Sequence, residues 1–313
     1  MTRRILAGAA AGLAALAGCA QLKAVPGLGA VADDMQRRGT ESAVKVGENV
    51  VTAAATGDLG KKATFSMEQE FHLGKTVAAN VVARLGGRTM PPADPLPRYL
   101  RDVGTVLALA AAEQRGAGDR PYPMRGYRFV VVDTPQVNAV GTPGGFVVVT
   151  TGLLRTVRSE DELAGVLAHE IAHVQRGHVM APVESAREQE HMTSALLAGT
   201  DPIVHAFFGK VVTVGTDFVL DKGYGKANEL EADALAARIL AGAGYDAQGL
   251  GRALGRLQGR SAEGGFFSRH PPAAERVASL SGVARSGVPG AEPSRTARFE
   301  AKVRELGKGR PPS

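Results

Sequence analysis

Apolar residues recur with helical spacing in several segments of the chain, and the clearest of these begins at Ser66. Ser66 and Gln69 have the spacing of a capping box, in which each side chain bonds the backbone of the other residue. The helix that follows is expected to end at Gly86-Gly87, and residues 91–97 are expected to form a turn. The same periodicity predicts further helices at residues 98–114, 159–176, 228–241, 247–257 and 271–280.

Two short apolar runs lack this periodicity and predict buried strands at residues 127–132 and 146–151, with a turn at Pro143-Gly144-Gly145 between them. Residues 179–227 show no clear pattern, and three charged or polar side chains interrupt the apolar stretch at 203–220. We expect this stretch to be a helix of the domain or a cover over the active site, not a transmembrane span. The elements together predict a mostly helical α+β fold with a small sheet.

The first residues have the pattern of a bacterial export signal. Two arginines precede an apolar run at residues 5–17, which is too short to cross a bilayer. The run ends in Leu16-Ala17-Gly18-Cys19, which resembles a lipobox, so we expect Cys19 to become a lipidated N-terminus. The alternative is an ordinary signal peptide with a chance cysteine. Ala20, where an aspartate resembles an inner-membrane retention signal, favours a periplasm-facing anchor in the outer membrane.

Composition excludes several classes of protein. The chain has 313 residues, 44% of them hydrophobic, and a formal net charge of +6, but no basic stripe with interleaved aromatic residues, so nucleic acid is not an expected partner. Cys19 is the single cysteine, which excludes an internal disulfide and a cysteine zinc site. We expect a signal peptide at 1–18, a lipidated tether at 19–63, one domain at 64–282 and a basic, partly helical tail at 283–313.

The segment with the strongest chemical signal is His169-Glu170-Ile171-Ala172-His173, an HExxH pattern inside a predicted helix. Four residues make about one helical turn, so both imidazoles project from one face and can share one metal ion. Glu170 is placed to take a proton from water at that ion. The alternative is a chance match, which the apolar residues preceding the motif disfavour.

A catalytic zinc site usually has a third protein ligand. His178 follows His173 by five residues and does not fit the metzincin spacing of six, so we expect it to be a helix-end or surface histidine. Glu229 and Asp233 are four residues apart and share a helical face, so that one can bind zinc while the other orients a ligand imidazole. Glu231 should face elsewhere. Alone, these acids would indicate only helix capping.

HExxH followed by ExxxD resembles the gluzincin metalloproteases related to HtpX and the CAAX prenyl protease, above all the soluble lipoprotein branch typified by LoiP and BepA. The resemblance implies a zincin-type domain in which His169, His173 and Glu229 bind one Zn²⁺, Glu170 is the general base and Asp233 orients a ligand. Lys226 stands where relatives often have arginine. The chain lacks the membrane helices of HtpX, so prenylated or intramembrane substrates are not expected. Matching stretches lie at residues 66–78, 137–154, 163–178, 224–236 and 268–276.

His270 precedes Pro271-Pro272, in a segment that resembles one placing a histidine near the metal in relatives. Three roles stay open for His270: a fourth zinc ligand that keeps the enzyme latent, a donor to the oxyanion, or a histidine far from zinc at the start of a helix. Tyr224 and Arg276 are further candidates for the oxyanion.

Two classes of function follow from these features. The first is a membrane-anchored zinc metalloendopeptidase that cleaves misfolded or unassembled envelope proteins. The second is an assembly factor or chaperone for outer-membrane proteins, in contact with their assembly machinery, with gated or absent peptidase activity. A lipoprotein that merely kept the motif is a third possibility. The strand at 146–151 either pairs with substrate as an added strand or is an ordinary core strand.

Overall fold

The computed structural model describes residues 65–186, 210–257, 270, 273–281, 286–304 and 306. The chain divides into two compact units. One consists of Met1–Thr64 with Glu184–Val211, of which only residues 184–186 and 210–211 are described. The other, Phe65–Val183 with Val212–Ser313, contains all the elements below. The expected signal peptide, tether and lipidated Cys19 lie outside the described residues. In the described part of the chain, no helix is both long and apolar enough to cross a membrane.

A four-stranded mixed sheet has the order β1-β2-β4-β3. Strand β4 (Phe146–Thr150) lies in the middle and pairs in parallel with β2 (Arg128–Asp133) and antiparallel with β3 (Ala139–Thr142). Strand β1 (Arg88–Thr89) pairs antiparallel with β2. Because both sides of β4 are already paired, the alternative that substrate pairs with this strand is wrong, and the alternative of an ordinary core strand holds. The short strands β1 and β3 were not predicted.

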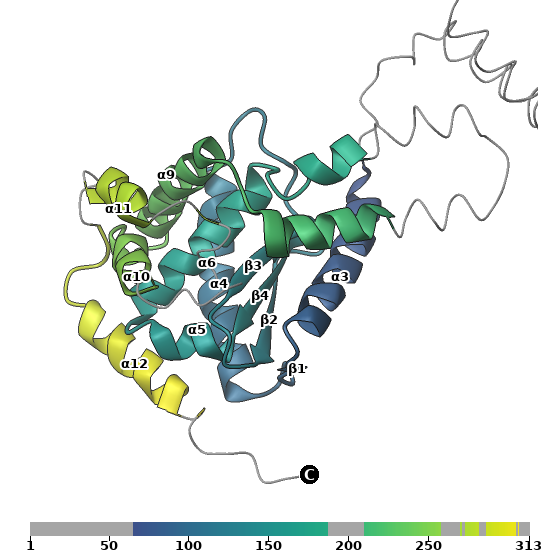
Figure 1. Cartoon of the computed structure of the whole chain (residues 1–313). Helices are drawn as coiled ribbons and strands as arrows, with labels where there is room; N and C mark the ends of the chain where they lie inside the picture. Colours follow the sequence, from purple (N-terminus) through teal and green to yellow (C-terminus); the bar gives the residue numbers. More distant parts are fainter. Residues whose placement is uncertain are drawn as a thin grey trace, which may run out of the picture. The chain divides into compact units, whose positions relative to one another are not determined.

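The helix with the zinc motif, α6 (Glu160–Gln175), is the centre of the unit (Figure 1), and all of its residues are buried. Helices α4 (Pro95–Glu113), α9 (Lys226–Gly242) and α10 (Gly249–Leu257) contact it, and β3 packs beside it. The expected α+β fold, with a small sheet beside the HExxH helix, is therefore confirmed. Helix α5 (Thr151–Thr156) and the π-helix η2 (Phe218–Lys222) were not separately predicted. Helix α11 (Ala273–Ser281) corresponds to the helix predicted at 271–280 and differs slightly in extent.

The N-terminal helix, α3 (Met67–Arg84), has the predicted capping box: Ser66 Oγ accepts from the Gln69 N–H, and Gln69 Oε1 accepts from the Ser66 N–H. Helix α4 begins at Pro95, inside the segment that we predicted as a turn. Proline is tolerated there because the N–H groups of a first helical turn have no partner within the helix. The turn Pro143–Gly145 forms as expected, with positive φ at Gly144 and Gly145.

The predicted tail at 283–313 is not separate from the domain. Helix α12 (Glu292–Arg304) packs against α6 and α4 and buries Phe299. Arg295 and Arg298 of α12 form ion pairs with Asp161 and Glu160, which are fully buried at the start of α6. The segment is partly helical, as predicted, but the compact unit extends beyond residue 282 because α12 neutralises these buried acids.

Candidate metal centre

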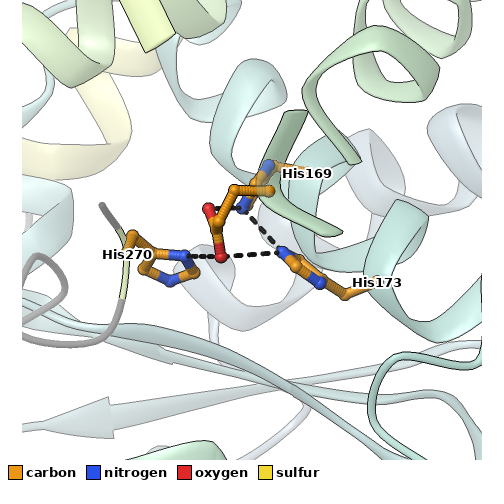
Figure 2. A group of neighbouring side chains, drawn as sticks. His169, His173 and His270 are labelled. Atoms are coloured by element: carbon orange, nitrogen blue, oxygen red, sulfur yellow. Dashed lines mark hydrogen bonds and ion pairs between the residues drawn. The ribbon is translucent and has the colours of Figure 1, made fainter. Parts of the chain in front are cut away.

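Helix α6 places His169 and His173 one turn apart, with both rings fully buried and their Nε2 atoms 3.0 Å from each other. Helix α9 brings Glu229 between the two rings. Its Oε1 lies 3.4 Å from Nε2 of His173, and its Oε2 lies 3.5 Å from Nε2 of His169. The structure thus brings together the three side chains that the sequence motifs single out as ligands (Figure 2).

His270 reaches the same group from the segment that precedes α11. Its ring is buried, and Nδ1 lies 2.6 Å from Oε1 of Glu229 (Figure 2). One ligand atom from each of His169, His173, Glu229 and His270 can be chosen so that all four lie within 4.8 Å of one another. The reading of His270 as a histidine remote from the metal group is therefore wrong. Its roles as fourth ligand and as oxyanion donor both remain compatible with this position.

A buried acid and a buried arginine fix the outer side of the group. Asp233, one turn after Glu229 on α9, places Oδ1 2.9 Å from Nδ1 of His169. Arg276 of α11 donates to both carboxylate oxygens of Asp233, at 2.8 and 2.6 Å, and its Nη1 lies 3.1 Å from Oε2 of Glu229. Arg276 was an oxyanion candidate, but the structure places it as a clamp on the two acids.

Glu170 lies between the two histidines on α6 and is buried where this helix packs against β3. Its Oε2 accepts the backbone N–H of Gly141 at 2.6 Å. A Cβ atom at Gly141 would stand 2.9 Å from the backbone oxygen of Glu170, so only glycine permits this close approach. The edge strand of the sheet thereby holds one carboxylate oxygen of the proposed base.

The surroundings of the group keep Glu229 and Asp233 ionised and His173 neutral, because they lower the pKa of all three side chains. Burial acts against ionisation of Glu229, but His270, His169 and His173 outweigh it and hold the pKa of this carboxyl far below its usual range. Burial likewise opposes ionisation of Asp233, while Arg276 and His169 lower its pKa to about 2. Burial, followed by the neighbouring positive charge of His169, lowers the pKa of His173 well below its ordinary value.

His169 behaves differently from the other two rings of the group. Burial and Arg276 lower its pKa, but the hydrogen bonds to Asp233 and Glu229 prevail and raise it to about 9. For His270, burial prevails over the attraction of Glu229 and lowers the pKa to about 4. In the absence of a metal ion, a proton on His169 therefore supplies positive charge to the centre of the group at neutral pH.

The donor set fits a divalent metal ion. Ligand atoms about 2.0–2.1 Å from a tetrahedral zinc ion lie about 3.4 Å from one another, close to the 3.0, 3.4 and 3.5 Å separations among His169, His173 and Glu229. Glu170, Glu229 and Asp233 are buried carboxylates, and Arg276 is a buried guanidinium. With the histidines neutral, as metal binding requires, two negative charges remain to be balanced, which one divalent ion would do.

Comparison with known proteins agrees with this geometry. The model of peptidase family M48 matches residues 103–284, which is more than half of the chain. The chain belongs to peptidase family M48. It is 28% identical over 227 residues to the beta-barrel assembly-enhancing protease of Escherichia coli K12, covering 69% of this chain and 42% of that protein. The same protease of Yersinia pestis is 29% identical over 214 residues, or 65% and 41% of the two chains.

A plant relative is the mitochondrial metalloendopeptidase OMA1 of Arabidopsis thaliana, 32% identical over 154 residues, which cover 48% of this chain and 30% of that protein. The chain spans less than half the length of these three relatives. M48 peptidases use zinc, and this family membership together with the buried group of four residues supports a zinc metalloprotease.

Three further residues of this M48 chain that the sequence singled out are placed by the structure. His178 lies at the end of α6, as one of the two predicted placements had it, but it is buried, and its Nδ1 lies 3.0 Å from Nδ1 of His173. The Tyr224 ring stacks on His173, with ring centroids 3.8 Å apart. Lys226, which stands where relatives often have arginine, forms an exposed ion pair at 2.6 Å with Glu275 of α11.

Proposed function

We propose that this chain is a zinc metalloendopeptidase that hydrolyses peptide bonds in unfolded protein substrates. The observation that carries the proposal is the buried group of His169, His173 and Glu229, with Glu170 on the same helix and held by a backbone N–H. In this proposal His169, His173 and Glu229 hold the metal, and Asp233 orients His169. Bound zinc supplies Lewis acidity that polarises the scissile carbonyl and activates water at neutral pH.

In this mechanism, side chains and backbone groups of the chain transfer the proton and hold the ligands in position. Glu170 accepts a proton from the attacking water and then delivers it to the leaving amine. Gly141 holds one oxygen of Glu170, which keeps the carboxylate aimed in one direction during both transfers. Asp233 and Arg276 keep His169 and Glu229 in place, so that the ligand geometry does not have to be built when the metal binds.

A matched pair of variants tests this mechanism. Glu170→Gln should bind about one zinc per chain and lose cleavage of an unfolded substrate such as casein, since only the base is changed. Alanine at His169, His173 or Glu229 should remove zinc and activity together. Cleavage by Glu170→Gln at the rate of the unaltered chain would refute the assignment of the base. Binding of unfolded clients by the same variant would instead support the alternative role as an assembly factor or chaperone.

We also propose that the chain is lipid-anchored through Cys19 at the outer membrane, faces the periplasm and acts on misfolded or unassembled envelope proteins. The lipobox-like sequence supports the anchor, and the similarity to the beta-barrel assembly-enhancing proteases of Escherichia coli and Yersinia pestis supports the setting. Mass spectrometry of the mature N-terminus tests the anchor. A free N-terminus at any other residue, with the protein in the soluble fraction, would reject it.

For His270 we propose the role of fourth ligand, because its ring is buried beside Glu229 within the possible metal group. Occupying the open coordination position would keep water from it and make the enzyme latent. His270→Ala should then cleave faster than the unaltered chain. A loss of about 100-fold in turnover would instead assign His270 to the oxyanion. Unchanged turnover, zinc affinity and stability would exclude both roles.

A further inference from the structure

The two histidines of α6 use their ring nitrogens in the same way. Each points Nε2 toward the metal group, with only 3.0 Å between the two Nε2 atoms, and each points Nδ1 outward. The Nδ1 atom of His169 faces Asp233 at 2.9 Å. The Nδ1 atom of His173 faces a second imidazole, since Nδ1 of His178 lies 3.0 Å away.

Local backbone geometry brings His178 to this place. At the end of α6, the His178 N–H donates to the His173 carbonyl and the Gly177 N–H donates to the Val174 carbonyl. These two bonds and the positive φ of 76° at Gly177 are those of a Schellman turn. The turn reverses the chain so that the His178 ring folds back over His173. The short spacing between the two histidines is therefore a consequence of how the helix ends.

The tautomers of the two rings follow from hydrogen-bond chemistry. A neutral imidazole carries one N–H and one acceptor nitrogen. If Nε2 of His173 offers its lone pair to a metal ion, its proton lies on Nδ1 and can be donated to Nδ1 of His178. His178 then carries its proton on Nε2, which faces Oε2 of Glu231 at 3.4 Å. One consistent set of protons thus connects Glu231, His178 and His173.

Glu231 is itself held in position. Its Oε1 lies 3.1 Å from Nε of Arg176, and Arg176 also pairs at 2.5 Å with Asp119. Asp119 is fixed in turn by Nε2 of Gln175, which donates to it at 2.8 Å. Glu231 lies on α9 between Glu229 and Asp233 but points to a different neighbour, so the same helix supports both histidines of α6.

We propose that His178, held by Glu231, is the positioning residue of His173, as Asp233 is for His169. The inference rests on the proposed zinc site and adds a residue that neither the HExxH nor the ExxxD pattern contains. Partners of this kind fix the orientation of a ligand imidazole and raise its basicity, and their loss typically weakens metal affinity by about 10–100-fold. His178 touches no substrate in this account and acts only through His173.

The test compares zinc affinity among full-length chains by titration against a competing chromophoric chelator. His178→Ala should bind zinc about 10–100-fold more weakly than the unaltered chain. His178→Asn should recover most of this loss, because the asparagine oxygen occupies the position of Nδ1 and can accept the same hydrogen bond. His72→Ala, at an exposed position of α3, is the matched control and should leave the affinity unchanged. The visible spectrum of the cobalt-loaded chain should change in His178→Ala and return in His178→Asn.

Two results would overturn the inference. One is zinc binding by His178→Ala with the affinity and cobalt spectrum of the unaltered chain. The other is equal weakening in His178→Ala and His178→Asn together with equal loss of thermal stability in their metal-free forms, which is the signature of packing alone. If the unaltered chain binds no zinc, the proposed function fails and the inference fails with it. Zinc binding that persists unchanged in His178→Ala rejects the inference and leaves the proposed function intact.

Discussion

Zinc binding to this chain should depend on pH because His169 holds a proton in the metal-free protein. Its pKa is raised to about 9, so at pH 7 about 99% of the metal-free molecules carry this proton. Zinc requires the neutral imidazole and must displace the proton. The cost at pH 7 is two pH units, or about 2.7 kcal/mol, which corresponds to about 100-fold in apparent affinity. The affinity should therefore rise about tenfold per pH unit from pH 6 to 8.5.

Calorimetry in buffers that differ in ionisation enthalpy measures this directly. We expect about one proton to be released per zinc ion bound at pH 7. Asp233→Asn removes the carboxylate that helps to raise the pKa of His169, so the variant should release less than one proton at the same pH. An affinity that does not change with pH, together with no proton release by the unaltered chain, would refute the assignment of a charged His169 in the metal-free state.

The same raised pKa affects the stability of the metal-free chain. The contribution from His169 is fully present below its ordinary pKa of 6.5 and is lost as the pH rises through about 9, which urea unfolding at several pH values in chelator can measure. Arg295→Ala leaves buried Asp161 without its guanidinium and should lower the free energy of unfolding by about 3–5 kcal/mol, whereas the exposed Arg304→Ala should change it by at most about 0.5 kcal/mol. Phe299→Ala should cost about 3–5 kcal/mol in the same assay, because the ring is buried between α12 and the core. A chain shortened before α12 that unfolds at the same urea concentration would contradict both expectations.

The sequence predicted the long helices well because their signals are local. Apolar periodicity and the capping box of Ser66 and Gln69 both depend on residues within two turns of one another. Helix α4 begins earlier than the sequence predicts because Pro95 and Pro97 are typical of turns, although a first helical turn also accepts proline. Strands β1 and β3 have two and four residues, too few for an alternating pattern, and only pairing with β2 and β4 defines them.

The metal-binding candidates could be predicted because a helix converts sequence spacing into geometry. Four residues between His169 and His173, and again between Glu229 and Asp233, place each pair on one helical face. The site of His178 could not be predicted in the same way, because a Schellman turn, and not the helix, brings its ring to His173. Arg276 lies on another helix, and no spacing in the sequence indicates that it clamps Asp233 and Glu229.

Helix α6 explains why the unit must extend to α12. All of its residues are buried, including the acids Glu160, Asp161 and Glu162 in its first turn. Acids suit the positive end of a helix, but burial makes each of them unfavourable unless a cation is near. Three arginines from later segments supply that charge: Arg256 from α10, and Arg295 and Arg298 from α12. Arg276 from α11 likewise supplies a positive charge to the buried acids of the metal group. The helix that carries HExxH is therefore stabilised by arginines of the last helices, so the environment of the metal centre depends on residues well beyond the motifs that reveal it.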